Sequence, residues 1–380
     1  MRVLNIVSDS VESSASIHHV HLHIEQQLRL RGAITESLLL TGAPHKDFGP
    51  SLAGSFDILR RPRKHPIAYR VLRAKVRQRI VSGNYTCVIA DGMMSANLLL
   101  DIQPTIDSRI RFLLVVHGRV TAMKPRLPIL RKAIRRGELP QWQVVAVSKD
   151  SAAHLEPQLP ASLRPVDVVE NCIDARAVQT SLLDRGRARK ALGLCDDNVV
   201  VGAIGRMSAE KDYGTLIRAF SLCDLPGAIL LLIGDGKERI ELERMAKQSG
   251  VGDKIVFAGF LAEARRYLKA YDCFVMSSRT EGSPIALLEA MAAGSPIVSS
   301  SITPLTAALP PHYPHVFEVG DPLALAKQLN SVIAMSGSER ECLGDSLLVH
   351  VKRRFSPQLF GDKYDRLVRG APDSQGEACA

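Results

Sequence analysis

Two acidic residues accompany an almost wholly apolar helix in the second half of the chain. The segment RTEGSPIALLEAMAAGSPIVSS, from Arg279 to Ser300, places Glu281 just before the helix and Glu289 on it. A buried carboxylate is costly unless a partner hydrogen-bonds it. The start of a helix also offers free N–H groups and a positive dipole end to an anion. These features predict an anion-binding site at the helix start.

The boundaries of that helix follow from three residues. Ser283 suits the N-cap, Pro284 suits the first helical position, and Gly294 suits the position after the last turn. We therefore expect a helix over Pro284–Ala293, buried on most of its circumference. Short apolar strands are expected directly before and after it, so the helix start lies at the carboxyl end of a strand, where open α/β sheets bind ligands.

A second candidate site is the segment VGAIGRMSAEKDYGTL, Val201–Leu216, which predicts a strand, a glycine turn and a helix start. Arg206 and Lys211 lie in the turn, again at the carboxyl edge of a strand. Two cations at that place could hold a diphosphate. The alternative is a solvated surface role, and the pattern alone does not decide between them.

The whole chain alternates strands with helices, which predicts a parallel sheet in each half. Apolar runs such as Ile229–Ile233 are typical of strands buried on both faces. We expect an α/β protein with two doubly wound domains that face each other. The expected strands are 3–8, 34–40, 86–91, 111–118, 143–148, 166–171, 199–205, 228–236, 254–259, 272–278 and 296–299.

The polar segment Asp184–Asn198 marks the expected domain boundary. We predict an N-terminal Rossmann-like domain over 1–185 and a C-terminal one over 186–355. A last helix and a disordered tail are expected over 356–380, since the end APDSQGEACA is polar and small.

Composition excludes several classes of protein. The chain has 380 residues, of which 46% are hydrophobic and only 5% aromatic, so an aromatic platform for single-stranded nucleic acid is not expected. No apolar run is long enough to span a membrane, and the N-terminus lacks the pattern of a signal peptide. The seven cysteines are scattered and odd in number, which favours reduced thiols in the cytoplasm.

The positive charge is concentrated in the first half. Residues 1–174 carry 24 Lys and Arg against 15 Asp and Glu. Two segments, Arg60–Arg79 and Lys124–Arg136, combine basic residues with Ile, Leu and Val at helical spacing and contain no acid. This pattern suits contact with an anionic membrane surface. A solvated basic helix is the alternative; nucleic acid is a third option without a recognition motif.

Taken together, EGSPIALLE, GRMSAEK, IGDGKERIELE and VFAGF resemble the retaining nucleotide-sugar glycosyltransferases of the GT-B fold, the family 4 type, also called glycosyl transferases group 1. The resemblance is dense over about 199–300 and looser in the first half, through VVHG, VAVSK and VVENCID. There, Glu170 and Cys172 replace a proline and a glycine of the family. The fold implied is GT-B, with two Rossmann-like domains facing a central cleft.

The resemblance implies a role for each candidate residue. Arg206 and Lys211 would neutralise the leaving diphosphate, Glu281 would bind hydroxyls of the transferred sugar, and Glu289 would bind the two ribose hydroxyls. His117 matches the family histidine that reaches the donor sugar; by itself it reads equally well as a core or capping histidine. The remaining donor-binding positions implied are Gly205, Gly259 and Phe260, and the helix start formed by Gly282, Ser283, Pro284 and Ile285.

The implied reaction is transfer of a hexose with retention from a nucleotide-sugar to a saccharide or lipid-linked acceptor, as in lipopolysaccharide or other envelope polysaccharide synthesis. The enzyme would be cytoplasmic and peripheral on the inner face of the membrane. A soluble transferase with a small-molecule acceptor and a non-catalytic basic scaffold or nucleic-acid binder remain alternatives. The family's Gly-Gly loop is replaced near Ala15-Ser16, and Ile302–His315 has no assigned role.

No metal and no cofactor are expected, because the chain contains no Asp-x-Asp pair. The histidines His18, His19, His21 and His23 raise the question of a metal site, since His19 and His23 share a helix face. No cysteine or acid in the adjacent sequence completes a tetrahedral set. Acceptor contact or a plain helix surface is therefore the favoured interpretation.

Overall fold

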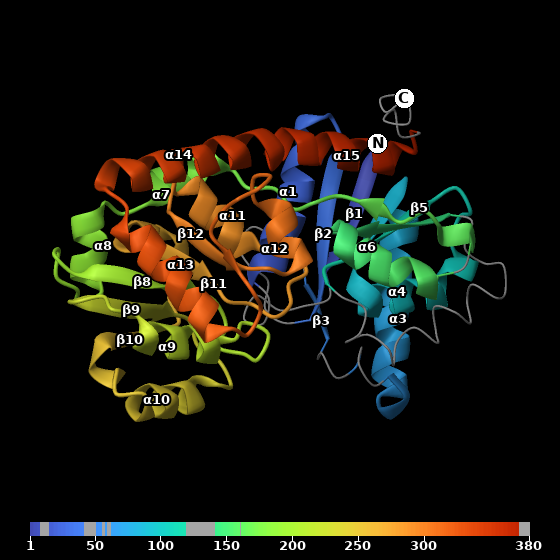
Figure 1. The fold of residues 1–380 in the computed structure, drawn as a ribbon. Coiled ribbons are helices and arrows are strands. Elements are labelled where there is room, and N and C mark those ends of the chain that lie inside the picture. The colour runs from blue at the N-terminus through green and yellow to red at the C-terminus, as the bar shows by residue number, and fades with distance from the viewer. Residues whose placement is uncertain are drawn as a thin grey trace. The chain divides into compact units, whose positions relative to one another are not determined.

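The computed structural model describes residues 1–7, 15–41, 51–54, 58, 62–118, 141–159 and 161–371. Contacts divide the chain into two units (Figure 1). The first comprises Met1–Cys172 together with Pro357–Ala380, and the second comprises Ile173–Ser356. The division thus lies at 172/173, whereas the sequence analysis placed it at 185/186.

The first unit is built on a seven-stranded parallel sheet in the order β3-β2-β1-β4-β5-β6-β7. Its central strands are apolar at nearly every position, as expected of strands covered on both faces. The strands are β1 (Arg2–Val7), β2 (Ile34–Thr41), β3 (Ser51–Gly54), β4 (Cys87–Asp91), β5 (Arg111–Val116), β6 (Trp142–Ala146) and β7 (Asp167–Val168).

Helices cover the sheet of the first unit. One face packs against α3 (Pro66–Ser82), α4 (Gly92–Ile102) and α6 (Lys149–Leu155), whose buried side chains join one core. The helices α1 (Ala15–Leu30) and α15 (Pro357–Arg369) pack against each other and contact the strands β1, β2 and β5. This packing is what groups the end of the chain with the first unit.

The second unit is built on a six-stranded parallel sheet in the order β10-β9-β8-β11-β12-β13. The change of direction in strand order lies between β8 and β11, the kind of position where doubly wound sheets bind ligands. The strands are β8 (Val199–Ile204), β9 (Ala228–Ile233), β10 (Ile255–Gly259), β11 (Cys273–Met276), β12 (Ile297–Ser300) and β13 (Val316–Phe317).

Two separate apolar cores cover the two faces of this second sheet. One contains buried residues of α7 (Ala175–Ser181), α8 (Arg185–Ala191), α11 (Ile285–Ala292), α12 (Thr303–Ala308) and α14 (Gly337–Arg354). The other contains those of α9 (Tyr213–Leu222), α10 (Arg239–Gln248) and α13 (Pro322–Ala334). Both units are therefore doubly wound and Rossmann-like, which confirms the predicted fold class.

The helix α11 begins one residue later than predicted. Pro284 occupies its N-cap, and the side chain of Ser283 makes no capping hydrogen bond, so the predicted serine cap is wrong. Its end follows the prediction: Gly294 has φ +67°, and the N–H groups of Gly294 and Ser295 donate to the carbonyls of Met291 and Ala290. This pair of hydrogen bonds is the Schellman motif.

Several other predictions can be compared directly. All the predicted strands are present, although β7 spans only two residues. The predicted basic helix is α3, and the segment without an assigned role contains α12. The basic segment Lys124–Arg136 lies outside the described residues. None of the described helices is long and apolar enough to cross a bilayer.

Candidate functional site

The candidate site of the second unit lies at the carboxyl edge of its sheet. The turns after three adjacent strands are hydrogen-bonded to one another. The Gly205 N–H donates to the Ile233 carbonyl, and the Gly234 N–H donates to the Gly259 carbonyl at 2.8 Å. The glycine turn that carries Arg206 is thus fixed to its neighbours.

Glycine is required where these turns meet. Gly234 has φ +137°, and a Cβ built on it would lie 1.9 Å from the carbonyl oxygen of Gly205. A Cβ on Gly236 would lie 2.2 Å from the carbonyl oxygen of Met207. The backbones therefore approach more closely than any side chain would permit.

Lys211 and Glu281 form an ion pair across this edge. Lys211 Nζ lies 2.6 Å from Glu281 Oε1, and the side chains are 22% and 9% exposed. The Ser278 hydroxyl donates to the same carboxylate oxygen at 2.7 Å, and the Ser277 hydroxyl donates to the Lys211 carbonyl at 2.8 Å. The two serines at the end of β11 therefore position both charged groups, a role that the sequence analysis missed.

A further pair of contacts fixes the same two loops. Asp212 has φ +47° and caps α9 through Thr215. Its carboxylate also binds Arg279 at 2.9 Å, and the Arg279 N–H donates to the Glu210 carbonyl at 2.8 Å. An aspartate three residues before a threonine at a helix start was the available signal for Asp212.

Arg206 is exposed at the turn after β8. The pKa of Glu210 is lowered, first by a hydrogen bond from Ser208 and further by the charges of Arg206 and Lys211.

Tyr213 lies on the inner side of the turn, where its buried hydroxyl has no hydrogen-bond partner within the described chain. Burial, with a contribution from the charge of Glu281, raises the pKa of that hydroxyl.

Glu289 is half-buried on α11. Burial raises the pKa of its carboxyl group to about 7, and the charge of Arg265 offsets only part of this effect. Among the described residues its carboxylate accepts no hydrogen bond and forms no ion pair. The described part of the chain thus gives this carboxylate no partner, and its contact with a ligand stays a prediction.

The start of α11 offers backbone donors at the same edge. Pro284 has no N–H, and the Ile285 N–H donates to the Ser283 carbonyl at 3.0 Å, so neither of these two predicted positions supplies a free amide. The amides of Gly282 and Ser283 have no partner in the described part of the chain. Phe260, after β10, is 73% exposed, and Gly259 before it has φ +71°.

His117 follows β5 in the first unit and belongs to a cluster of three titratable side chains. Its Nε2 lies 3.0 Å from Asp91 Oδ1 and 3.3 Å from His21 Nε2. Burial by itself would raise the pKa of Asp91, but hydrogen bonds from His117 and His21 outweigh it and hold that pKa well below its usual range. The sequence analysis singled out both histidines but missed Asp91.

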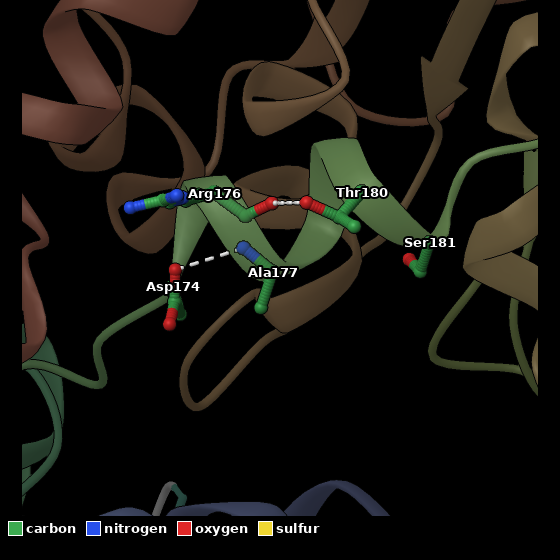
Figure 2. A pocket seen from close by; sticks show the side chains of 5 residues that line it. All are labelled: Asp174, Arg176, Ala177, Thr180 and Ser181. Atoms are coloured by element: carbon green, nitrogen blue, oxygen red, sulfur yellow. Dashed lines mark hydrogen bonds between the residues drawn. The ribbon is translucent and has the colours of Figure 1, made fainter.

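A surface hollow lies elsewhere in the second unit, along α7 (Figure 2). It is lined by Asp174, Arg176, Ala177, Thr180 and Ser181. Its polar groups serve the helix itself: Asp174 caps the Ala177 N–H at 2.9 Å, and Thr180 donates to the Arg176 carbonyl at 2.8 Å. No predicted site residue lines it, so we place the candidate site at the sheet edge instead.

Comparison with known proteins shows that part of the second unit is similar to one protein family. The model of the family described as "Glycosyl transferases group 1" matches residues 184–345. This matched segment lies within the second unit.

Two curated relatives extend the comparison. The chain is 33% identical to the lipopolysaccharide core biosynthesis glycosyltransferase LpsE of Rhizobium meliloti over 177 aligned residues. These residues are 46% of this chain and 51% of the relative. It is 27% identical to the 2-deoxystreptamine glucosyltransferase of Streptomyces kanamyceticus over 241 aligned residues. These residues are 62% of this chain and 57% of the relative. The chain thus spans just over half the length of these two relatives.

Solved structures show the same fold over nearly the whole chain. Anabaena HepE, solved in complex with UDP and glucose, superposes with a TM-score of 0.80 at 19% identity, covering 97% of this chain and 100% of that one. WaaG, a glycosyltransferase involved in lipopolysaccharide biosynthesis, gives a TM-score of 0.69 at 14% identity, covering 97% and 100%. The fold is that of GT-B glycosyltransferases.

Proposed function

We propose that this protein is a retaining glycosyltransferase that moves a sugar from a nucleotide-sugar to a saccharide or lipid-linked acceptor in cell-envelope polysaccharide synthesis. One observation carries most of the proposal. Lys211 and Glu281 form an ion pair at the carboxyl edge of the second sheet, Arg206 follows β8 at the same edge, and Glu289 lies on α11, which begins there.

Each group has a role in this proposal. Arg206 and Lys211 bind the diphosphate, and the amides of Gly282 and Ser283, which have no partner among the described residues, add donors at the start of α11. Glu289 accepts hydrogen bonds from the ribose hydroxyls, which compensates its burial. Glu281 binds hydroxyls of the transferred sugar and is oriented for this by Ser278.

In the proposed reaction the bond between the anomeric carbon and the diphosphate oxygen breaks. A bond from the acceptor oxygen to the same carbon forms on the same face, so the configuration is retained. The acceptor proton passes to the leaving phosphate, whose charge Arg206 and Lys211 stabilise. The work of the protein is then positioning and electrostatic stabilisation, and this reaction requires no metal. His117 is proposed to contact the donor sugar.

The lipid-linked acceptor is supported by the surface of α3. Ile67 and Val71 are 78% and 49% exposed. They share one helix face with exposed Arg70, and Lys75 follows one turn later. Exposed apolar residues next to cations suit the interface of an anionic membrane. The similarity to LpsE, named for lipopolysaccharide core biosynthesis, favours the same class of acceptor.

A second candidate is a transferase with a small polar acceptor. The similarity to a 2-deoxystreptamine glucosyltransferase favours it, because that relative is named for a small aminocyclitol acceptor. Both candidates share the donor site and differ only in the acceptor.

The first test is a thermal-shift panel of UDP-, GDP- and ADP-sugars on the wild type, Glu289→Ala and the control Glu341→Ala. Glu341 is an exposed acid on α14. A ligand that binds only the native state raises the melting temperature. We expect one nucleotide series to stabilise the wild type and Glu341→Ala but not Glu289→Ala. If no nucleotide stabilises the wild type, the transferase proposal fails and a non-catalytic role of the basic first unit takes its place.

A further inference from the structure

The first unit contains a cluster of three titratable side chains, of which the proposed transfer reaction uses His117 alone. Its members are His21 on α1, Asp91 at the end of β4 and His117 after β5. We propose that these three side chains bind a divalent transition-metal ion, with Zn²⁺ as the probe. This proposal concerns metal binding alone and does not rest on the proposed transferase activity.

The three ligand atoms form a nearly equilateral triangle. His117 Nε2 lies 3.0 Å from Asp91 Oδ1, His21 Nε2 lies 3.4 Å from the same oxygen, and the two nitrogens are 3.3 Å apart. Zinc binds such ligands at about 2.0–2.2 Å in tetrahedral geometry, which places neighbouring ligand atoms roughly 3.3 Å apart. The triangle therefore has the dimensions of one face of a zinc coordination tetrahedron.

A hydrogen bond fixes the tautomer of His21. Its Nδ1 lies 2.8 Å from Asn5 Oδ1, while Asn5 Nδ2 donates to the Ser37 hydroxyl at 3.3 Å. The Asn5 oxygen therefore accepts from His21 Nδ1–H, which leaves Nε2 with a lone pair in the neutral ring. Metal-binding histidines commonly have such a partner on the other ring nitrogen.

The Nε2 atoms of His21 and His117 face the same carboxylate oxygen of Asp91, at 3.4 and 3.0 Å. With the His21 ring neutral, a metal ion at the centre of the triangle would accept the Nε2 lone pair and neutralise the carboxylate.

The placement of Asp91 agrees with a ligand role. Asp91 occupies the N-cap of α4, where an aspartate ordinarily accepts from the first helical N–H groups, but it makes no capping hydrogen bond. The carboxylate points toward the histidines instead. The side chains of His21 and Asp91 are 0% and 5% exposed, so the cluster is shielded on that side.

The His117 side chain is 12% exposed, and we expect water to supply the fourth ligand. Three protein ligands and an exchangeable fourth are typical of reactive zinc sites. Two imidazoles and one carboxylate suit Zn²⁺, Co²⁺ or Ni²⁺, whereas Mg²⁺ and Ca²⁺ prefer oxygen ligands.

The acid that completes this set was absent from the local sequence. Asp91 is far from the α1 histidines in sequence and is brought to them by the pairing of β1 with β4. The pairing of β4 with β5 brings His117 close to Asp91. The three residues are therefore neighbours in the fold and not along the chain.

The test uses tag-free protein stripped with a chelator, titrated with Zn²⁺ against a fluorescent zinc indicator and with Co²⁺ by visible absorption. His117→Asn is the main variant, because its side chain is partly exposed and its replacement disturbs the core least. Asp91→Asn is the second variant. The double variant His18→Asn/His19→Asn and the exposed His312→Asn are controls for other histidines. Circular dichroism and the melting temperature establish that each protein is folded.

We expect one Zn²⁺ per chain, Co²⁺ bands typical of four- or five-coordinate sites, and an affinity at least about 100-fold weaker in His117→Asn. Asp91→Asn should weaken binding similarly, while both controls bind as the wild type does. Sub-stoichiometric binding, or equal binding by folded His117→Asn, would overturn the proposal and leave a metal-free Asp–His pair. Should Asp91→Asn not fold, the His117→Asn result decides alone.

Discussion

The ammonium group of Lys211 lies 2.6 Å from the carboxylate of Glu281, and both side chains are mostly buried. These two residues lie in turns that follow different strands, and the sequence analysis gave them separate roles on the diphosphate and the sugar. In the structure the two charges neutralise each other. A bound diphosphate would therefore share Lys211 with Glu281.

We expect Lys211→Met to lower kcat by about 100- to 1,000-fold with a smaller change in the donor KM. The reason is that a cation at the departing diphosphate stabilises charge that develops in the transition state. The measurement is steady-state release of nucleoside diphosphate with the donor identified by thermal shift. Lys254→Met, at an exposed lysine before β10, is the matched control. An unchanged kcat in Lys211→Met would remove Lys211 from the mechanism.

The same ion pair predicts a stability coupling. Lys211→Met and Glu281→Gln should each lower the free energy of unfolding by about 1–3 kcal/mol, because each leaves a mostly buried group without its partner. The double variant should lose less than the sum of the two. Urea unfolding of the four proteins measures the coupling, and strict additivity would contradict the paired geometry.

The pKa of about 7 at Glu289 predicts a pH dependence of stability and of nucleotide binding. Burial raises the folded-state pKa above the unfolded value, so the folded state holds the proton more tightly. The stabilisation is fully present below the unfolded pKa and is lost as pH rises through 7. We expect the melting temperature of the free protein to fall between pH 5 and about 8, and Glu289→Gln to flatten this fall.

Nucleotide binding should show the opposite trend, because the ionised carboxylate is the better acceptor for ribose hydroxyls. Affinity should rise with pH through about 7, with protons released on binding below that pH. Calorimetry in buffers of different ionisation enthalpy measures the released protons. Glu289→Gln should bind about 10- to 100-fold more weakly and release none. A wild type without proton release at pH 6 would contradict a ligand-facing Glu289.

Gly234→Ala should destabilise the second unit by at least about 3 kcal/mol, because a backbone oxygen lies 1.9 Å from the added Cβ and φ is +137°. Gly193→Ala is the matched control. Gly193 has φ +69° but no atom within 4 Å of the built Cβ, so it should cost only about 1 kcal/mol from backbone strain. Urea unfolding measures the loss of unfolding free energy in each variant. Similar losses in Gly234→Ala and Gly193→Ala would show that the close approach of the backbones at the sheet edge is unimportant.

Sequence patterns predicted most elements of this fold because the buried parallel strands are apolar runs between turn residues. The helix α11 was placed to within a residue, since Pro284 and Gly294 mark its ends. The predicted cap at Ser283 failed, because the Ile285 N–H bonds the Ser283 carbonyl in a tighter turn. The domain boundary was placed in the polar segment 184–198, but contacts rather than polarity define the division at 172/173.

The candidate site was only partly predictable, for a different reason. Arg206, Lys211, Glu281 and Glu289 stand in recognisable local motifs. Ser277, Ser278 and Asp91 have no such signal, because their roles depend on strand pairing between distant segments. The order of the strands in a parallel sheet cannot be inferred from the spacing of neighbouring residues.

The surface of α3 yields the last prediction. Arg73 and Arg77 donate to the Asp101 carbonyl and the Thr105 hydroxyl, and Arg79 binds Glu36. These three arginines therefore form contacts within the first unit. By contrast, Arg70 and Lys75 are exposed and have no such partner among the described residues.

We expect Arg70→Glu/Lys75→Glu to reduce co-sedimentation with vesicles of phosphatidylglycerol and phosphatidylcholine by about 10-fold or more at low salt. Each cation near an anionic surface contributes about 1 kcal/mol, and charge reversal adds repulsion. Lys247→Glu/Lys254→Glu, in the second unit, makes the same change in net charge and is the control. Equal losses in both variants would indicate a nonspecific charge effect rather than a membrane-binding face on α3.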